Sequence, residues 1–177
     1  RRSRPEATQS FRIHMPSAAV PFVPRTVAVL GAGAVGGFFG AKLAGAGIDV
    51  VLIGRPPHVE AIAREGLLVL QRDGELRVRV RAATEPRAAS GADIVLVAVK
   101  SPDTTDAARS LAPHLRPEAR VVSMQNGVDN AARIAAVLTE PVYAAVVYVG
   151  VNMDGAGRVR HTGRGDLVLG LPRAIAP

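Results

Sequence analysis

The segment Thr26-Val-Ala-Val-Leu-Gly-Ala-Gly-Ala-Val-Gly36 places a short β-branched strand directly before three glycines and a helical pattern. This order of strand, glycine turn and helix is what a dinucleotide-binding βαβ unit requires. Gly31 permits a tight turn, Gly33 lets the backbone approach a pyrophosphate, and Gly36 lets the helix pack close to the strand. A glycine-rich turn without a ligand is the alternative. Because the helix N-terminus also offers free N–H groups to phosphates, we expect a nucleotide cofactor to bind at Gly31, Ala32, Gly33, Ala34, Val35 and Gly36.

The second informative position follows the next predicted strand, Asp49–Ile53. NAD-binding domains carry an Asp or Glu about 20 residues after the glycines, where it binds the ribose 2′-hydroxyl. This sequence has Gly54-Arg55 there, and Asp49 lies at the other end of the strand. A guanidinium can hold a 2′-phosphate through two charge-assisted hydrogen bonds. We therefore predict NADPH rather than NADH, with Arg55 at the 2′-phosphate; a solvated surface arginine is the alternative.

Size and composition indicate one globular domain. The chain has 177 residues, of which 48% are hydrophobic and 21% charged, enough for a sizeable core. It has no cysteine, which excludes disulfides, thiolate metal sites and cysteine nucleophiles. The four histidines lack the spacing of metal ligands, so we expect no metal. No apolar run approaches the ~20 residues that span a bilayer, and we expect a cytoplasmic protein without a membrane partner.

The net charge of +7 raises the question of a nucleic-acid partner. Four arginines lie within the first 24 residues, and the others are dispersed rather than set among stacking aromatics. Aromatic residues make up only 3% of the chain. A nucleic-acid surface normally combines clustered basic residues with aromatic stacking platforms, so we predict no nucleic-acid partner. Part of the positive charge could attract an anionic cofactor.

The pattern along the chain predicts a proline- and arginine-rich disordered leader at 1–24 and a domain at 25–171. Strands and helices alternate in the domain, which favours a doubly wound, Rossmann-like α/β fold. Its sheet is expected to be mostly parallel, with antiparallel strands at the C-terminal end. The predicted helices are 35–46, 58–65, 103–115 and 128–138. The predicted strands are 26–30, 49–53, a hairpin of 67–71 and 76–81, 93–99, 120–124, and three short C-terminal strands at 142–151, 158–161 and 166–169.

Two further polar residues follow predicted parallel strands. Lys100 closes the apolar run that begins at Asp93, and Asn126 follows the strand at 120–124. Ligands of open α/β sheets bind beyond the carboxyl ends of the strands, where both residues are expected. From spacing alone, Lys100 is equally compatible with cofactor contact and with a solvated strand end. Asn126 could orient a nicotinamide or a substrate carbonyl, or could be a turn asparagine beside Gly127.

Other candidates for acid–base or nucleophilic chemistry are weaker. His161 lies on a predicted strand and is interpreted as structural. Ser101 and Ser123 have no nearby histidine or carboxylate partner in the sequence, so a serine hydrolase is disfavoured. Tyr143 and Tyr148 are interpreted as packing residues. The sequence therefore contains no convincing proton donor for carbonyl reduction.

Five segments, taken in order, resemble the ketopantoate reductases (2-dehydropantoate 2-reductases), and the resemblance extends from Arg25 to about Leu171. It implies that the glycine loop wraps the pyrophosphate and that Arg55 takes the 2′-phosphate. It also implies that Lys100 contacts the cofactor and that Asn126 lies between nicotinamide and substrate. The segments are Gly31-Ala-Gly-Ala-Val-Gly36, Ile53-Gly-Arg55, Val99-Lys-Ser-Pro-Asp-Thr104, Gln125-Asn-Gly-Val-Asp129 and Gly157-Arg-Val-Arg-His-Thr-Gly-Arg-Gly165.

The resemblance further implies an activity, the NADPH-dependent reduction of 2-dehydropantoate, a 2-oxo acid, to pantoate in pantothenate synthesis. Such enzymes join a Rossmann domain to a helical domain that supplies the proton-donating lysine and most substrate contacts. The sequence ends at Pro177, about where that domain should begin, so we expect residues 172–177 to start the linker to it. We therefore expect this chain to bind NADPH without appreciable turnover.

Two alternatives stay open at this stage. A related 2-oxo or 3-hydroxy acid dehydrogenase would have a similar cofactor half. A stand-alone, non-catalytic NADPH-binding module would need another cover for its cleft and sheet edges, which leaves a homodimer open.

Overall fold

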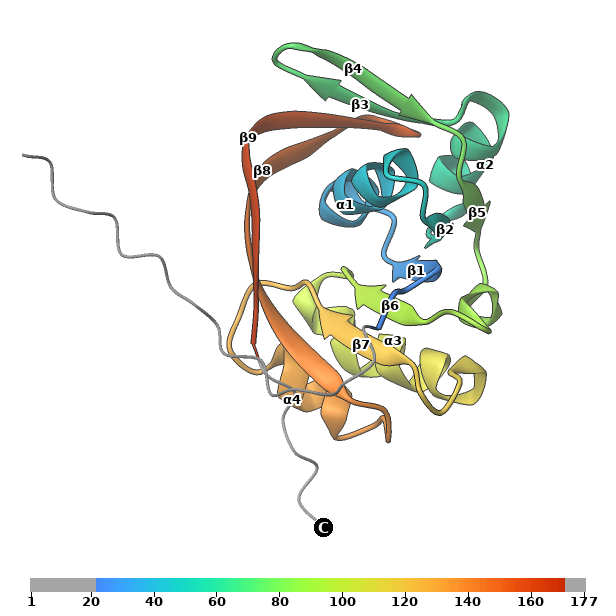
Figure 1. Ribbon diagram of the computed structural model, residues 1–177, viewed down its shortest axis with the longest axis vertical. Helices are drawn as coiled ribbons and strands as arrows, with labels where there is room; N and C mark the ends of the chain where they lie inside the picture. Colours follow the sequence, from blue (N-terminus) through green and yellow to red (C-terminus); the bar gives the residue numbers. More distant parts are fainter. Residues whose placement is uncertain (1–21, 171–177) are drawn as a thin grey trace, which may run out of the picture.

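The computed structural model describes residues 22–170 (Figure 1). Most of the expected leader at 1–24 and all of the expected linker at 172–177 lie outside the described residues. Within them, one continuous sheet of nine strands has the order β4-β3-β9-β8-β7-β6-β1-β2-β5. The strands are β1 (Thr26–Leu30), β2 (Asp49–Ile53), β3 (Leu67–Gln71), β4 (Gly74–Val78), β5 (Arg81–Ala83), β6 (Ile94–Val97), β7 (Arg120–Ser123), β8 (Val142–Gly155) and β9 (Arg158–Leu169).

Six of these strands form the parallel half of the sheet. Their order, β5-β2-β1-β6-β7-β8, is that of a Rossmann fold, with β1 central between β2 and β6. Strands β1, β2, β6 and β7 are short, mostly apolar runs because they are covered on both faces. In β1, Val27 and Val29 enter one core and Ala28 and Leu30 enter the other. The predicted doubly wound fold class is confirmed.

The helices are α1 (Ala34–Gly45), α2 (Pro56–Glu65), α3 (Thr104–Leu111) and α4 (Asn130–Ala135), with three short 3-10 segments at Pro86–Ala89, Ser101–Asp103 and Ala112–His114. Helices α1 and α2 contribute to one core, and α3 and α4 contribute to the other. Among residues 22–170, no helix is both long enough and apolar enough to cross a membrane.

The other half of the sheet, β4-β3-β9-β8, is mixed, since β3 and β9 pair in parallel and the other two pairs are antiparallel. This half curls over α1 (Figure 1). Strand β8 leaves β7 after Ala144 and continues as a long antiparallel pair with β9. Strand β9 in turn pairs with β3 around Val159, which is fully buried. Helix α1 is therefore covered by the Rossmann strands on one side and by the curled strands on the other. Its sequence is accordingly apolar except for Lys42, which is exposed near the C-terminal end of the helix.

Glycines permit this double cover of α1. A Cβ at Gly40 would lie 2.6 Å from Leu52 Cδ2 of β2. A Cβ at Gly37 would lie 3.0 Å from Val159 Cγ2 of β9. Helix α1 thus approaches both layers more closely than a side chain would allow, and this close packing holds the loop before α1 in place.

The expectation of three short C-terminal strands was wrong. The structure has two long strands, and register shifts near Tyr148, Gly150 and Met153 bend the pair. Gly163 and Gly165 lie inside β9 rather than in turns, because bulges accommodate the extra residues. A Cβ at Gly150 would lie 2.6 Å from Thr162 Oγ1, so that glycine serves a close contact between strands.

Three other segments also differ from the expectation. The segment expected as one strand at 76–81 is divided, since β4 ends at Val78 and pairs with β3, whereas β5 pairs with β2. The helix expected at 103–115 is regular only over α3, because Pro102 and Pro113 lie in 3-10 turns at its two ends. The helix expected at 128–138 is likewise shorter, and ends at Ala135.

Candidate functional site

A cavity of about 670 Å³ lies at the carboxyl edge of the parallel strands. It is bounded by the loop between β1 and α1, by the start of α2, by the loop after β6 and by the turn between β8 and β9. This is the edge at which open α/β sheets bind their ligands. Its lining includes Gly31, Ala32, Gly33, Gly54, Arg55, His58, Thr84, Val99, Lys100, Asp103, Met153, Gly155 and Ala156.

The turn after β1 is held against both neighbouring strands. The backbone N–H groups of Gly31 and Ala32 donate to the carbonyl of Ile53 at 2.9 and 3.0 Å. Gly31 has φ of +102°, which favours glycine, and a Cβ there would lie 2.6 Å from the carbonyl carbon of Ala98. Gly31 therefore has the tight-turn role that the sequence predicted.

The other two glycines differ in the space around them. A Cβ at Gly36 would lie 2.2 Å from the carbonyl oxygen of Gly31, so Gly36 lets α1 approach the turn. Gly33 precedes α1, is exposed and has nothing within 4 Å of an added Cβ. Its open side faces the cavity. The first N–H groups of α1, on Ala34 and Val35, have no carbonyl partner within the helix and can serve an anion.

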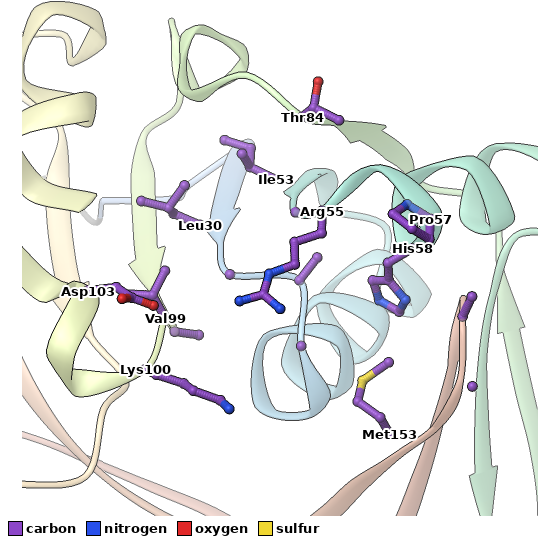
Figure 2. A pocket seen from close by; sticks show the side chains of 17 residues that line it. Leu30, Ile53, Arg55, Pro57, His58, Thr84, Val99, Lys100, Asp103 and Met153 are labelled. Atoms are coloured by element: carbon purple, nitrogen blue, oxygen red, sulfur yellow. The ribbon is translucent and has the colours of Figure 1, made fainter. Parts of the chain in front are cut away.

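Arg55 and Lys100 bring positive charge to the cavity. Figure 2 shows both side chains projecting into it, Arg55 from the start of α2 and Lys100 from the loop after β6. Both residues are exposed, and neither forms an ion pair within the described residues. Their charges therefore remain available to a phosphate-bearing ligand.

Asn126 lies on the loop after β7, next to the loop that carries Lys100. Ser101 Oγ donates to the carbonyl of Asn126 at 3.2 Å. Asn126 itself is exposed and does not line the cavity within the described residues. Ala34, Val35 and Gly36 form the start of α1, and they do not line the cavity either. The structure thus brings Gly31, Ala32, Gly33, Arg55 and Lys100 together and places Asn126 on the adjacent loop.

His58 is a cavity residue that sequence reasoning missed. Its Nδ1 accepts a hydrogen bond of 2.8 Å from the N–H of Gly157, in the turn between β8 and β9. Nε2 is buried and has no hydrogen-bond partner within residues 22–170. Burial lowers the pKa of the imidazole, an effect that the backbone of Ala32 opposes in part. Because Nδ1 accepts a hydrogen bond, the neutral ring carries its proton on Nε2.

The lowered pKa of His58 predicts a pH dependence of stability. The unfolded chain takes up a proton at about pH 6.5, whereas the folded chain takes it up only at lower pH. The contribution of His58 to the free energy of unfolding is therefore fully present above about pH 6.5. It is lost as the pH falls toward the lowered pKa, because the unfolded chain is protonated first. Urea unfolding between pH 7.5 and 5 should show this loss, and His58→Asn should reduce it. An equal slope in the two proteins would contradict the assignment to His58.

The turn between β8 and β9 was also missed as a part of the site. Met153, Gly155 and Ala156 reach the cavity from a hairpin that lies far along the sequence from the glycine loop (Figure 2). Only the curl of the sheet brings them there, and no local pattern signals it. For His58, the available signal was its position three residues after Arg55, in the first turn of the helix that leaves the cavity.

The remaining sequence candidates have structural contacts. The ring of His161 stacks on Phe38 of α1 with 4.5 Å between ring centroids, and its Nε2 contacts the carbonyl of Arg164. Ser123 is buried and hydrogen bonds to Gln125. Arg164 lies over the ring of Tyr148 at 4.6 Å. The contacts of His161 agree with its structural interpretation, whereas Tyr148 is 43% exposed and does not lie in the core.

Comparison with known proteins identifies relatives of this domain. The family model described as "Ketopantoate reductase PanE/ApbA" matches residues 27–173. A 2-dehydropantoate 2-reductase of Halobacterium salinarum is 42% identical over an alignment of 151 residues, and the match covers 81% of this chain and 48% of that protein. One from Pyrococcus abyssi is 37% identical over 143 residues, 81% of this chain and 46% of that protein. The crystal structure of a PanE/ApbA family ketopantoate reductase from Ralstonia eutropha JMP134 has a TM-score of 0.80 and 49% identity, covering 81% of this chain and 48% of that one.

The extent of the match is as informative as its strength. The chain spans about half the length of the curated relatives it matches. The matched region includes the glycine loop, Arg55, Lys100 and Asn126. On this evidence the chain belongs to the ketopantoate reductase family.

Proposed function

We propose that this chain supplies the NADPH-binding half of an enzyme that reduces 2-dehydropantoate to pantoate. The observation that carries the proposal is the combination, in one cavity, of an open glycine turn at Gly33 with Arg55, which has no ion pair within residues 22–170. The turn offers backbone N–H groups to a pyrophosphate, and the guanidinium can hold a 2′-phosphate. Family membership supports 2-dehydropantoate as the substrate, because the two relatives compared above are 2-dehydropantoate 2-reductases.

Each candidate residue from the sequence has a distinct proposed role. Gly31 to Gly36 hold the pyrophosphate at the N-terminus of α1, where the helix dipole favours negative charge. Arg55 selects the 2′-phosphate, and Lys100 contacts the cofactor from the opposite side of the cavity. Asn126 orients the nicotinamide or the substrate carbonyl through its free amide. When bound, the reduced nicotinamide supplies a hydride.

Two measurements on the 177-residue chain test this proposal. Isothermal titration should detect NADPH binding, with markedly weaker binding of NADH. Steady-state assays with 2-dehydropantoate should show negligible turnover, since the family resemblance implies that the proton donor belongs to a helical domain. Failure to bind NADPH would refute the cofactor assignment. Clear turnover would show that a residue of this chain protonates the product oxygen, and Lys100 would then be the first residue to replace.

A further inference from the structure

Two loops at the carboxyl edge of the sheet are joined by their own hydrogen bonds. The loop after β6 carries Lys100 and Ser101, and the loop after β7 carries Asn126. The carbonyl oxygen of Asn126 accepts from Ser101 Oγ at 3.2 Å and from Asn130 Nδ2 at 2.7 Å. The main chain at Asn126 is therefore fixed from two directions, although its side chain is exposed.

The turn that follows Asn126 depends on the same contacts. Gly127 has φ of +114°, and a Cβ there would lie 3.1 Å from Asn130 Nδ2. The side chain of Asn126 has no hydrogen bond among the interactions found within residues 22–170. A fixed main chain with a free amide is the arrangement expected of a residue that is presented to a ligand.

Behind these loops lies a fully hydrogen-bonded group of buried side chains. Thr104 is 0% exposed, Asn130 1% and Gln125 7%. Thr104 Oγ1 accepts from Gln125 Nε2 at 2.7 Å and lies 3.0 Å from Asn130 Oδ1 and 2.8 Å from the carbonyl of Ser101. Gln125 Nε2 also donates to the carbonyl of Val99 at 3.0 Å. The single hydroxyl of Thr104 therefore connects the side chains of Gln125 and Asn130 with the main chain of the loop after β6.

Helix α4 adds a charged member to the group. Arg133 donates from Nη1 to the carbonyl of Ser101 at 2.9 Å and from Nη2 to Thr105 Oγ1 at 3.3 Å. Buried polar networks whose members are all satisfied hold their elements in one arrangement. We refer to Ser101, Thr104, Gln125, Asn130 and Arg133 as the polar clasp.

We infer that the polar clasp positions the amide of Asn126 for the cofactor, with Thr104 and Asn130 as positioning residues that do not touch the ligand themselves. The inference rests on the proposed function, because it concerns how NADPH is held. It adds that cofactor binding depends on buried residues behind the loops, and not only on the residues at the strand ends. The separation of Lys100 and Asn126 is set by buried side chains on α3 and α4.

Matched substitutions at Thr104 test the inference. Thr104→Val keeps the shape of the side chain but removes the hydroxyl that Gln125 and Asn130 share, and it should weaken NADPH binding by the chain about three- to tenfold. Thr104→Ser keeps the hydroxyl and should restore affinity to within twofold of the original chain. Ser110→Ala removes a hydroxyl of the same helix that bonds only to the carbonyl of Ala107, and it serves as the control.

A double-mutant cycle separates positioning from general destabilisation. If Thr104 acts through Asn126, Thr104→Val should have little effect on NADPH affinity once Asn126→Ala is present. Equal losses in the two backgrounds, or no loss in either, would overturn the inference. If Thr104→Val prevents folding, Ser101→Ala takes its place in the cycle, because it removes one bond to Asn126 at a less buried position. Absence of NADPH binding by the original chain would refute the proposed function itself, and the inference with it.

Discussion

Arg55→Ala should weaken NADPH binding about 10- to 100-fold and change NADH binding less than threefold. Hydrogen bonds to a charged group contribute about 1.5–3 kcal/mol, and only NADPH has the 2′-phosphate that would receive them. Arg55 is exposed and has no ion pair within the described residues, so its loss should not disturb the fold. Isothermal titration with both cofactors measures the difference.

Two companion variants make this result specific. Arg55→Lys keeps the charge but loses the planar fork, and it should give an intermediate loss of NADPH affinity. Arg109→Ala removes one positive charge from α3, where the side chain is 68% exposed and paired only with Asp106. It should leave both affinities unchanged. An equal loss of NADPH and NADH affinity in Arg55→Ala would refute the proposed contact with the 2′-phosphate.

The largest contrast is expected between two alanine substitutions in the glycine loop. Gly36→Ala places a Cβ 2.2 Å from the carbonyl oxygen of Gly31, so α1 must shift away from the turn. Overpacking of this kind costs about 1–3 kcal/mol or more, and should lower Tm by several degrees together with cofactor affinity. Gly33→Ala meets no atom within 4 Å, and φ of −78° suits alanine.

Gly33→Ala should therefore leave the protein folded, with a loss below about 1 kcal/mol from the weaker helix cap. Its Cβ would nevertheless occupy the space through which a pyrophosphate approaches the backbone, and NADPH binding should fall by 100-fold or more. Thermal unfolding and titration of the two variants test the pair. Normal NADPH affinity in Gly33→Ala would show that the pyrophosphate does not bind at this turn.

Local sequence was sufficient to predict strands β1, β2, β6 and β7 of the parallel half. The turn at Gly31 and the close packing at Gly36 depend on neighbours within the same βαβ unit, so the spacing of the glycines was informative. Arg55 and Lys100 were placed correctly at the carboxyl edge because each follows an apolar strand. The alternation of strands and helices predicted the doubly wound fold class, although not the order of the strands.

The features that were missed all depend on contacts between distant segments. The partner of His58 Nδ1 is the N–H of Gly157, 99 residues away along the chain. Asn130 and Thr104, 26 residues apart, are ordinary helix residues in the sequence, and only the packing of α3 against α4 makes them partners. The curl of β8 and β9 depends on bulges, for which glycine within a strand is an ambiguous signal.

The double cover of α1 has a consequence for how the chain is made. The register pairs Leu68 with Arg158 and Leu70 with Arg160, so the second cover of α1 forms only after almost the whole domain has been synthesised. Until then, the face of the helix that meets Val159 remains open to water, although every residue of the glycine loop is already present. Pairings so far apart in sequence form slowly. The nascent chain therefore carries a nearly complete nucleotide-binding sequence while one apolar face of its first helix stays uncovered until β9 has been synthesised.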